Sequence, residues 1–201
     1  MIEFVIKQSK YKIGMFGRKK HINTEIDIES TIQELQRGSA EAFHILYHKY
    51  NQKIYRFCLR MLCDSKLAED AFQETFIKLF EHKKDFRGAN FSAWLYAIAR
   101  NTCLNLIRSR KNYEQYDALT NFPLQEKSTD YYTKKYIQDA IMNLPVSLRE
   151  AIILREYQEC SYQEIAEIVG IDLSLAKVRV HRARLILRKT LEPIAKEIYE
   201  H

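Results

Sequence analysis

Phosphate contact is the chemistry that this sequence supports most clearly, because one stretch of the chain separates its charges. Residues 137–172 contain seven acidic residues and two basic ones, whereas the next seventeen residues, Leu173–Lys189, contain six basic residues and no acidic one. Lysine and arginine side chains pair with the phosphates of nucleic acid. A basic helix that follows a short helix and a tight turn is the arrangement with which a helix-turn-helix enters the major groove. The pattern therefore predicts a segment that reads duplex DNA.

Local signals mark the elements that must position these cations. Ser161 and Glu164 have the spacing of a capping box, so the first helix should begin at Ser161. Gly170 suits the left-handed residue that ends this helix, and Asp172 or Ser174 can cap the next one. The apolar positions of the second helix, which recur at helical steps and predict a buried stripe, are Ala176, Val180, Ala183 and Leu187.

This stretch resembles the C-terminal region of the sigma-70 family, in its small extracytoplasmic-function (ECF) branch. The runs that carry the resemblance are Leu154–Glu156, Ser161–Ala166, Gly170–Asp172 and Leu175–Arg188. In that family the region is a helix-turn-helix that recognises the minus-35 element of a promoter. The resemblance implies the same contact through Arg155, Lys177, Val178, Arg179, His181, Arg182 and Arg184.

Three positions of the second helix depart from the family pattern. Leu175, Ala176 and Val178 stand where threonine, valine and serine are usual. Val178 matters most, because it replaces a hydroxyl near the groove by an apolar group. Such a group can still touch the methyl of thymine, so the departure concerns promoter preference rather than DNA binding.

The first half of the chain contains two more helical patterns. Ser39–Cys63 carries apolar residues at helical steps, and Lys66–Phe80 follows after a break at Asp64 and Ser65. The expected core positions of the first pattern are Phe43, Leu46, Tyr47, Tyr50, Ile54, Phe57 and Met61.

Asp64–Phe80 resembles the segment with which this family binds core RNA polymerase. There an acidic, amide-bearing helix face docks on a basic coiled coil of the largest polymerase subunit. The resemblance assigns this role to Asp70, Gln73 and Glu74, with Phe76 as an apolar anchor. A plainer interpretation of Asp70 also stands, because carboxylates near the start of a helix stabilise its positive end.

Cations and aromatic residues are mixed in Lys83–Lys111, a combination that holds single-stranded nucleic acid. The order of residues resembles the family's region for recognising and melting the minus-10 element, in which a loop takes a flipped base. Trp94 has core spacing, so we expect it to be buried rather than stacked on DNA. The expected DNA contacts are Lys83, Lys84, Phe86, Arg87, Asn90, Phe91, Arg100, Asn101, Asn105 and Arg108.

The sequence predicts an all-α fold of two small helical domains, because five glycines and three prolines leave few breaks in 201 residues. By the resemblance, residues 26–111 form the helical bundle of sigma region 2, and residues 136–201 form the helix-turn-helix of sigma region 4. Residues 112–135 are polar and lack a sustained apolar period, which is typical of a flexible linker. Residues 1–25 are a basic extension that we expect to be disordered. Pro193 is expected to interrupt or end the last helix.

Metal, redox and enzyme chemistry find little support. The sequence has no C-x-x-C motif, so we expect free thiols at Cys58, Cys63, Cys103 and Cys160. His44 and His48 lie one helical turn apart, but two imidazoles without further ligands make a weak metal site. We find no glycine loop for phosphate and no nucleophile elbow, and therefore expect neither an enzyme nor a cofactor. Without a secretory signal or a membrane-spanning run, the expected protein is cytoplasmic and not inserted in a membrane.

The partners implied by the resemblance are core RNA polymerase, promoter DNA and an anti-sigma factor of the kind common in this branch. The net charge of +6 is consistent with an anionic partner. Two other functions stay open: an operator-binding regulator that uses only the helix-turn-helix, and a helical protein that sequesters polymerase without binding DNA. The mixture of cations and aromatics in Lys83–Lys111 argues against both.

Overall fold

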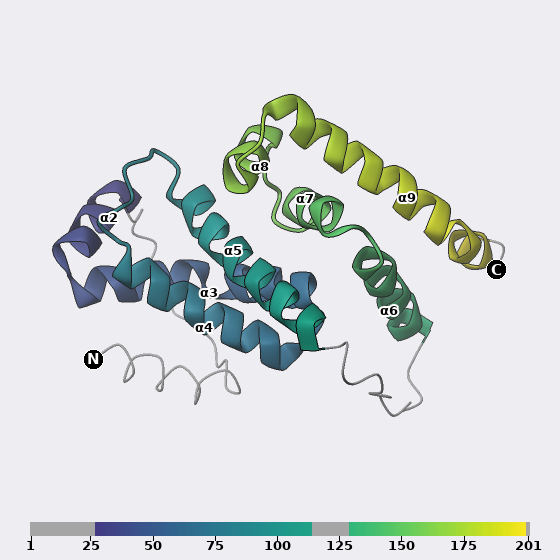
Figure 1. Cartoon of the computed structure of the whole chain (residues 1–201), viewed down its shortest axis with the longest axis horizontal. Helices are drawn as coiled ribbons and strands as arrows, with labels where there is room; N and C mark the ends of the chain where they lie inside the picture. The colour runs from purple at the N-terminus through teal and green to yellow at the C-terminus, as the bar shows by residue number, and fades with distance from the viewer. Residues whose placement is uncertain (1–26, 114–128, 200–201) are drawn as a thin grey trace.

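The computed structural model describes residues 27–113 and 129–199, and every regular element in these two ranges is an α-helix. The N-terminal domain contains α2 (Ile28–Arg37), α3 (Ala40–Leu62), α4 (Ser65–Glu81) and α5 (Phe91–Tyr113). The C-terminal domain contains α6 (Thr129–Met142), α7 (Val146–Glu156), α8 (Tyr162–Val169) and α9 (Leu173–Tyr199). Figure 1 shows the two groups of helices next to each other, with α9 along the outer edge of the second group. The predicted all-α fold of two helical domains is confirmed.

The core of the N-terminal domain is formed by α3, α4 and α5, which pack against one another. Ser39 begins α3 by accepting a hydrogen bond from the backbone of Ala42, and Asp64 begins α4 by accepting bonds from Lys66 and Leu67. All seven predicted core positions of α3 are buried. Asp64, which the sequence marked as part of a break between two helices, therefore caps the second helix.

The short helix α2 precedes α3, which is the first helix predicted from the sequence. The side chain of Asp27 accepts a hydrogen bond from the backbone of Glu29 and so begins α2. Gly38 ends this helix with a φ of 97°, in the left-handed region that favours glycine. Ile32 and Leu35 pack into the core, so α2 belongs to the N-terminal domain.

The C-terminal domain packs α7 and α8 against α9. The capping box of Ser161 and Glu164 is present at the start of α8, and Gly170 ends that helix with a φ of 73°. Asp172, rather than Ser174, caps α9 by accepting a hydrogen bond from the backbone of Leu175. The helix-turn-helix predicted from the sequence is therefore present, with its turn at Gly170.

Two predicted helix ends differ from the structure. The helix α6 begins at Thr129, inside the segment 112–135 that the sequence predicted as a linker. No glycine or proline interrupts this helix between Thr129 and Met142. Pro193 lies inside α9 and does not end it. Proline removes one backbone hydrogen bond, but its fixed φ of about −65° is compatible with a continuing helix. The predicted extension 1–25 lies outside the described residues.

Candidate nucleic-acid and polymerase interfaces

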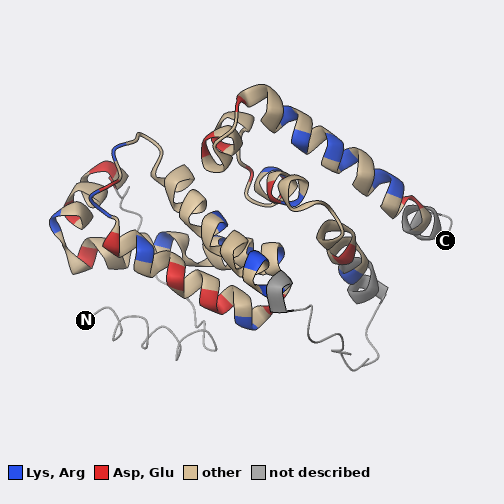
Figure 2. Cartoon of the chain, in the orientation of Figure 1, with Lys and Arg blue, Asp and Glu red and all other residues tan. Residues whose placement is uncertain are grey.

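The helix α9 presents a basic face to solvent above an apolar stripe. Ala176, Val180 and Ala183 are fully buried, as the sequence predicted. Figure 2 shows a row of basic residues along α9. The predicted minus-35 contacts on the exposed side of this helix are Lys177, Val178, His181 and Arg182. Because Val178 is 40% exposed, it presents an apolar group beside three side chains that can bind phosphate or base edges.

Three other arginines predicted to contact the minus-35 element have partners within the C-terminal domain. Arg179 donates to the buried carboxylate of Glu150 at 3.1 Å. Arg184 pairs with Glu156 at 2.6 Å, and this hydrogen bond raises the pKa of the Arg184 guanidinium.

Arg155 joins the end of α7 to the start of α8. It donates to the backbone carbonyl of Cys160 at 2.8 Å, and its guanidinium lies 4.7 Å from the ring centre of Tyr162. These contacts orient the two helices that support α9. Arg155, Arg179 and Arg184 therefore make contacts within the C-terminal domain, whereas the side chains of Lys177, His181 and Arg182 are exposed on α9.

The predicted polymerase-docking face lies on α4. Asp70 and Glu74 are exposed and Gln73 is half-buried, and Glu74 pairs with Lys78 at 3.2 Å. The prediction of Phe76 as an apolar anchor was wrong, because this side chain is only 1% exposed. Its ring packs 4.8 Å from that of Tyr47 in the core between α3 and α4. The half-buried Phe72 packs against Phe76, with 5.1 Å between the ring centres.

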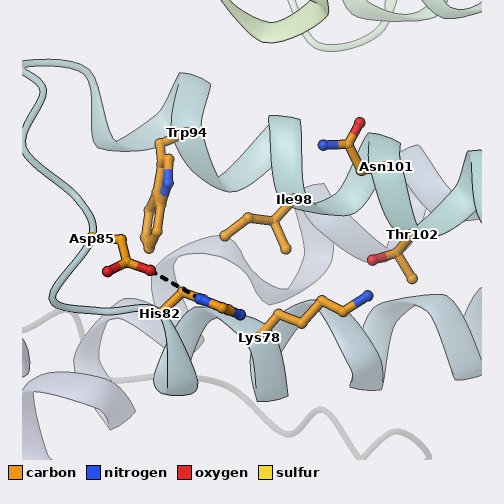
Figure 3. A pocket seen from close by; sticks show the side chains of 7 residues that line it. All are labelled: Lys78, His82, Asp85, Trp94, Ile98, Asn101 and Thr102. Carbon is orange, nitrogen blue, oxygen red and sulfur yellow. Dashed lines mark hydrogen bonds and ion pairs between the residues drawn. The ribbon is translucent and has the colours of Figure 1, made fainter.

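A pocket of about 260 Å³ lies between α4 and α5 (Figure 3). Its lining residues come from the end of α4, the following loop and α5, and they are Lys78, His82, Asp85, Trp94, Ile98, Asn101 and Thr102. Among these seven residues, only Asn101 is a DNA contact predicted from the sequence. Trp94 is half-buried rather than fully buried, and its ring packs 5.3 Å from that of Phe86.

The polar groups of this pocket have unequal partners. His82 Nδ1 lies 2.9 Å from Asp85 Oδ2, and both side chains are exposed at the rim. The hydroxyl of Thr102 is buried and has no hydrogen-bond partner. Figure 3 shows this hydroxyl pointing into the space between α4 and α5 that Lys78 and Ile98 border. The pocket therefore combines an aromatic wall with polar groups at the rim, and the hydroxyl oxygen of Thr102 is buried beneath its surface.

The other predicted minus-10 residues differ in their exposure. Lys84, Arg87, Asn105 and Arg108 are exposed. Lys83 donates to the backbone carbonyl of Phe80 at 2.8 Å and so closes the end of α4.

The prediction that Phe91 contacts DNA was wrong, because this ring is only 3% exposed. It packs 5.5 Å from Phe86 and 5.7 Å from Tyr50, at the first turn of α5. Phe91 therefore supports the loop before α5 from below, while Phe86 is the partly exposed aromatic of that loop.

Two predicted DNA contacts, Asn90 and Arg100, instead join the two domains. Asn90 caps α5 and donates to Glu164 at 3.2 Å. Arg100 makes two hydrogen bonds to Glu150, at 2.8 and 3.2 Å. The Glu150 side chain is 2% exposed, so a charge that would be costly alone is matched by Arg100 from one domain and Arg179 from the other.

A neutral hydrogen bond between side chains also crosses the domain interface. The hydroxyl of Tyr96 donates to the side-chain carbonyl of Gln158 at 2.7 Å, and burial raises the pKa of Tyr96. Arg60 also lies over the ring of Tyr157, 4.2 Å from its centre. The interface joins α5 to α8 and α3 to α7, and leaves the exposed face of α9 uncovered.

The cysteines and histidines form no comparable site in the described ranges. All four cysteines are free, and burial raises the pKa of Cys160 to about 12, so this thiol stays protonated. His44 and His48 approach each other, with their Nε2 atoms 3.0 Å apart on the exposed side of α3. Among the residues that the structure describes, no cluster of three or more histidine, cysteine or acidic side chains is placed to hold a metal. No helix within those same ranges has the length and apolar character needed to cross a membrane.

Comparisons with known proteins match both domains. The family model described as Sigma-70 region 2 matches residues 46–113, and the model described as Sigma-70, region 4 matches residues 134–187. The chain is 33% identical to the ECF RNA polymerase sigma factor SigW of Bacillus subtilis, over 85% of this chain and 100% of that protein. It is 30% identical to the RNA polymerase sigma-H factor of Pseudomonas aeruginosa, over 87% of this chain and 98% of that one.

Solved structures have a similar fold. The chain is similar to the sigma factor RpoE of Bartonella quintana, solved in complex with the anti-sigma factor NepR, with a TM-score of 0.64 and 28% identity. That match covers 76% of this chain and 98% of the other. CnrH, solved in complex with the cytosolic domain of CnrY, matches with a TM-score of 0.66 over 82% of this chain and 96% of that one. At 20% identity this second likeness concerns the fold alone.

Proposed function

Because the chain belongs to the sigma-70 family, in its ECF group, we propose a division of labour among its residues in transcription initiation. A protein of this family binds core RNA polymerase and directs it to promoters, and the family consists of initiation factors rather than enzymes. In the proposal, residues 26–111 bind the polymerase and open the minus-10 element, and residues 136–201 read the minus-35 element. Residues 112–135 connect the two, with the start of α6 included. The corresponding place of action is the cytoplasm.

The observation that carries the proposal is the exposed face of α9. Lys177, His181 and Arg182 are exposed while the opposite stripe of the same helix is buried, so the helix can enter a groove without unfolding its domain. Arginine and lysine contact phosphates and guanine edges, and Val178 suits a thymine methyl. Arg155, Arg179 and Arg184 contribute by holding α7, α8 and α9 in position.

Polymerase docking is assigned to the exposed acidic side of α4. Asp70 and Glu74 lie one turn apart, with Gln73 beside them, and the buried cluster around Phe76 holds the helix rigid behind them. Acidic groups on a rigid helix complement a basic partner surface, which speeds association and fixes its register. The proposed docking surface is therefore Asp70, Gln73 and Glu74, supported by Phe76 rather than including it.

The minus-10 strand is assigned to the loop between α4 and α5 and to the pocket that it borders. The volume of about 260 Å³ equals that of about nine water molecules, which accommodates one base of about eight to eleven non-hydrogen atoms. Trp94 and Ile98 supply apolar walls for an unstacked base, and Lys84, Arg87 and Arg108 can follow the backbone. Extruding a base costs a few kcal/mol, which such a site can offset.

The domain interface must open when both promoter elements are bound. The two elements lie about 25 base pairs apart, which corresponds to about 85 Å along the duplex at about 3.4 Å per base pair. A compact body of the described residues has a diameter of only about 40 Å. The 15 residues between α5 and α6 allow a further separation of up to about 50 Å. Asn90 and Arg100 then become available to DNA only after they leave Glu164 and Glu150.

A protein that covers these surfaces would regulate initiation. A relative of this chain, RpoE of Bartonella quintana, is solved with an anti-sigma factor. By similarity we propose a partner of that class for this chain. The operator-binding and sequestering alternatives are not favoured, because relatives named as RNA polymerase sigma factors align with both domains over nearly their whole length.

The test is run-off transcription with bacterial core RNA polymerase on a pool of genomic promoter fragments, with core alone as the control. Discrete start sites that require the chain support the proposal, and their alignment yields the two promoter elements. Stable binding to core without any transcript would favour a sequestering protein. Binding to a duplex site without binding to core would favour an operator-binding regulator.

A further inference from the structure

A second acid-free run of the chain lies in α3. Residues 42–63 contain four basic side chains and two histidines but no acidic residue, the same segregation of charge that marks the start of α9. The four basic residues are Lys49, Lys53, Arg56 and Arg60. None of them is a DNA contact predicted from the sequence. The run therefore has the charge pattern of a phosphate-binding helix, and it lies outside the three proposed surfaces.

These four cations form one row along α3, here called the α3 basic row. They recur at steps of four, three and four residues, and 3.6 residues per turn place such positions within an arc of about 60°. Lys49, Lys53 and Arg56 are exposed, and Arg60 is half-buried. The rise of 1.5 Å per residue makes the row about 17 Å long. Because the opposite side of α3 is packed in the core, the row is a cationic edge on a fixed helix.

The α3 basic row has no carboxylate partner in the part of the chain that the structure describes. Lys78, Arg100 and Arg184, by contrast, each pair with a glutamate. Like charges three or four positions apart destabilise a helix, and no acidic residue between Ala42 and Cys63 offsets this repulsion. An anionic partner that follows the row would remove the repulsion and gain from all four charges.

The row borders the face of the N-terminal domain that the C-terminal domain covers. Arg60, at the end of the row, lies 4.2 Å from the ring centre of Tyr157. Arg100, on the adjacent helix α5, pairs with Glu150 of α7. When the domains separate, both arginines are released on the side of α3 and α5 that faced α7. The row therefore adjoins the predicted minus-10 surface through Arg100.

The surroundings of the row favour the backbone of duplex DNA over other anionic partners. Sites for single strands combine cations with exposed aromatic rings, and membrane-binding helices combine them with exposed apolar side chains. Within the described ranges, the exposed large apolar side chains lie on α6, on α9 and directly after α7, and none lies on α3. One strand of duplex DNA carries a phosphate for about every 3.4 Å of its axis, so about 17 Å of duplex offers about five phosphates.

We propose that the α3 basic row binds the phosphate backbone of duplex promoter DNA. This inference rests on the proposed function of the chain in initiation and adds a further DNA surface to it. The contact is independent of base sequence, because every promoter presents the same phosphates. The row contributes affinity and orientation, and it leaves the reading of bases to the other surfaces.

The test measures how the binding of holoenzyme to duplex promoter fragments depends on salt. Holoenzyme is assembled from the full chain and core polymerase, and the fragments come from several promoters found by run-off transcription. Each phosphate contact contributes about 0.9 to the slope of log K against log salt, so Lys53→Gln combined with Arg56→Gln should reduce the slope by about 1.8. At about 0.1 M salt the affinity should fall about tenfold or more, by similar factors on every promoter.

The matched control is Arg37→Gln combined with Lys135→Gln. It removes one exposed arginine from α2 and one exposed lysine from α6, so it changes the net charge equally outside the row. Its slope should stay within about 0.5 of the wild-type value. Because Lys53 and Arg56 have no described carboxylate partner, their replacement should keep or raise the melting temperature, which separates DNA contact from a role in folding.

Four results would overturn the inference. The slope is unchanged in the Lys53–Arg56 variant, or it falls equally in the control. Alternatively, it falls only on premelted fragments, which assigns the row to a single strand. In the fourth case the variant loses affinity for core while its slope on DNA is unchanged, which assigns the row to a protein contact. Wild-type holoenzyme that binds promoter fragments no more tightly than unrelated duplex overturns the proposed function itself, so the two failures are distinguishable.

Discussion

Removing one partner of the Tyr96–Gln158 hydrogen bond should open the two domains and strengthen binding to core polymerase. Tyr96 is 3% exposed, and its hydroxyl donates to Gln158 at 2.7 Å. In Gln158→Ala the closed form buries a hydroxyl without a partner, whereas in the open form water can satisfy it. The loss therefore falls on the closed form, at about 1–3 kcal/mol.

Replacing the other residue of this hydrogen bond should cost the closed form less free energy. Tyr96→Phe removes the donor and leaves only the half-buried amide of Gln158 without its bond, so the closed form should lose about 0.5–1.5 kcal/mol. The double variant should cost less than the sum of the two, because neither polar group is then left unpaired. This coupling separates the hydrogen bond from unrelated effects of either substitution.

The affinity for core polymerase reports the opening. If core binds only the open form, the apparent affinity is the intrinsic affinity multiplied by the fraction of the chain that is open. Competition for labelled core should show a gain of up to about 5- to 150-fold for Gln158→Ala, which follows from about 1–3 kcal/mol at about 1.4 kcal/mol per tenfold. Gln52→Ala, which changes an exposed glutamine of α3, is the matched control and should leave the affinity unchanged. Unaltered or weaker core binding by Gln158→Ala would refute the reasoning that this interface opposes docking.

Three further predictions concern the reading helix, the docking face and the helix cap. Arg182→Ala should lower promoter-directed transcription at least about fivefold, because it removes an exposed base or phosphate contact, while core binding stays intact. Asp70→Lys combined with Glu74→Lys should abolish core binding in a pull-down, since the charge of the docking face is reversed. The backbone N–H of Ser161 holds the pKa of Glu164 below its usual value, so the capping box should stabilise α8 fully above about pH 4.5 and lose this contribution as the pH falls through the lowered pKa. Thermal melting of wild type and Glu164→Gln against pH should therefore converge in acid.

Matched variants make these outcomes decisive. Arg37→Ala removes an exposed arginine from α2, and Glu34→Lys reverses an exposed charge on the same helix. Neither should reproduce the loss of transcription or of core binding. If Arg182→Ala also loses core binding, the substitution has disturbed folding instead of DNA contact. If Glu164→Gln melts below the wild type by the same margin at every pH, the carboxylate does not act through its charge.

Elements governed by near neighbours in the chain were predictable. The capping box, the left-handed Gly170 and the buried stripe of α9 each depend on residues within one or two helical turns. Local hydrogen bonds and helical periodicity decide such features wherever the segment packs. The start of α6 and the course of α9 through Pro193 were missed because composition alone does not say where a helix stops.

The roles of Phe76 and Phe91 could not be separated from periodicity alone. Both rings lie beside polar residues that the sequence assigned to partner surfaces, and an aromatic at the edge of a helical stripe can face either way. Packing decided the matter, since Phe76 meets Tyr47 from α3 and Phe91 meets Tyr50 from the same helix. Burying a large aromatic ring is favourable, so both rings pack into the core although their polar neighbours in the sequence face solvent.

Charge segregation, helix caps and periodicity are local properties, so the two helical domains, the family of the chain and the basic helix with its turn could be predicted from the residues alone. The packing of the helices is needed to bring Asn90 and Arg100 to the other domain, and to place Lys78, His82, Trp94 and Thr102 around one pocket. Asn90 and Glu164 are 74 positions apart, and Arg100 and Glu150 are 50 apart. Pairings over such separations depend on how whole helices pack, which no local pattern specifies.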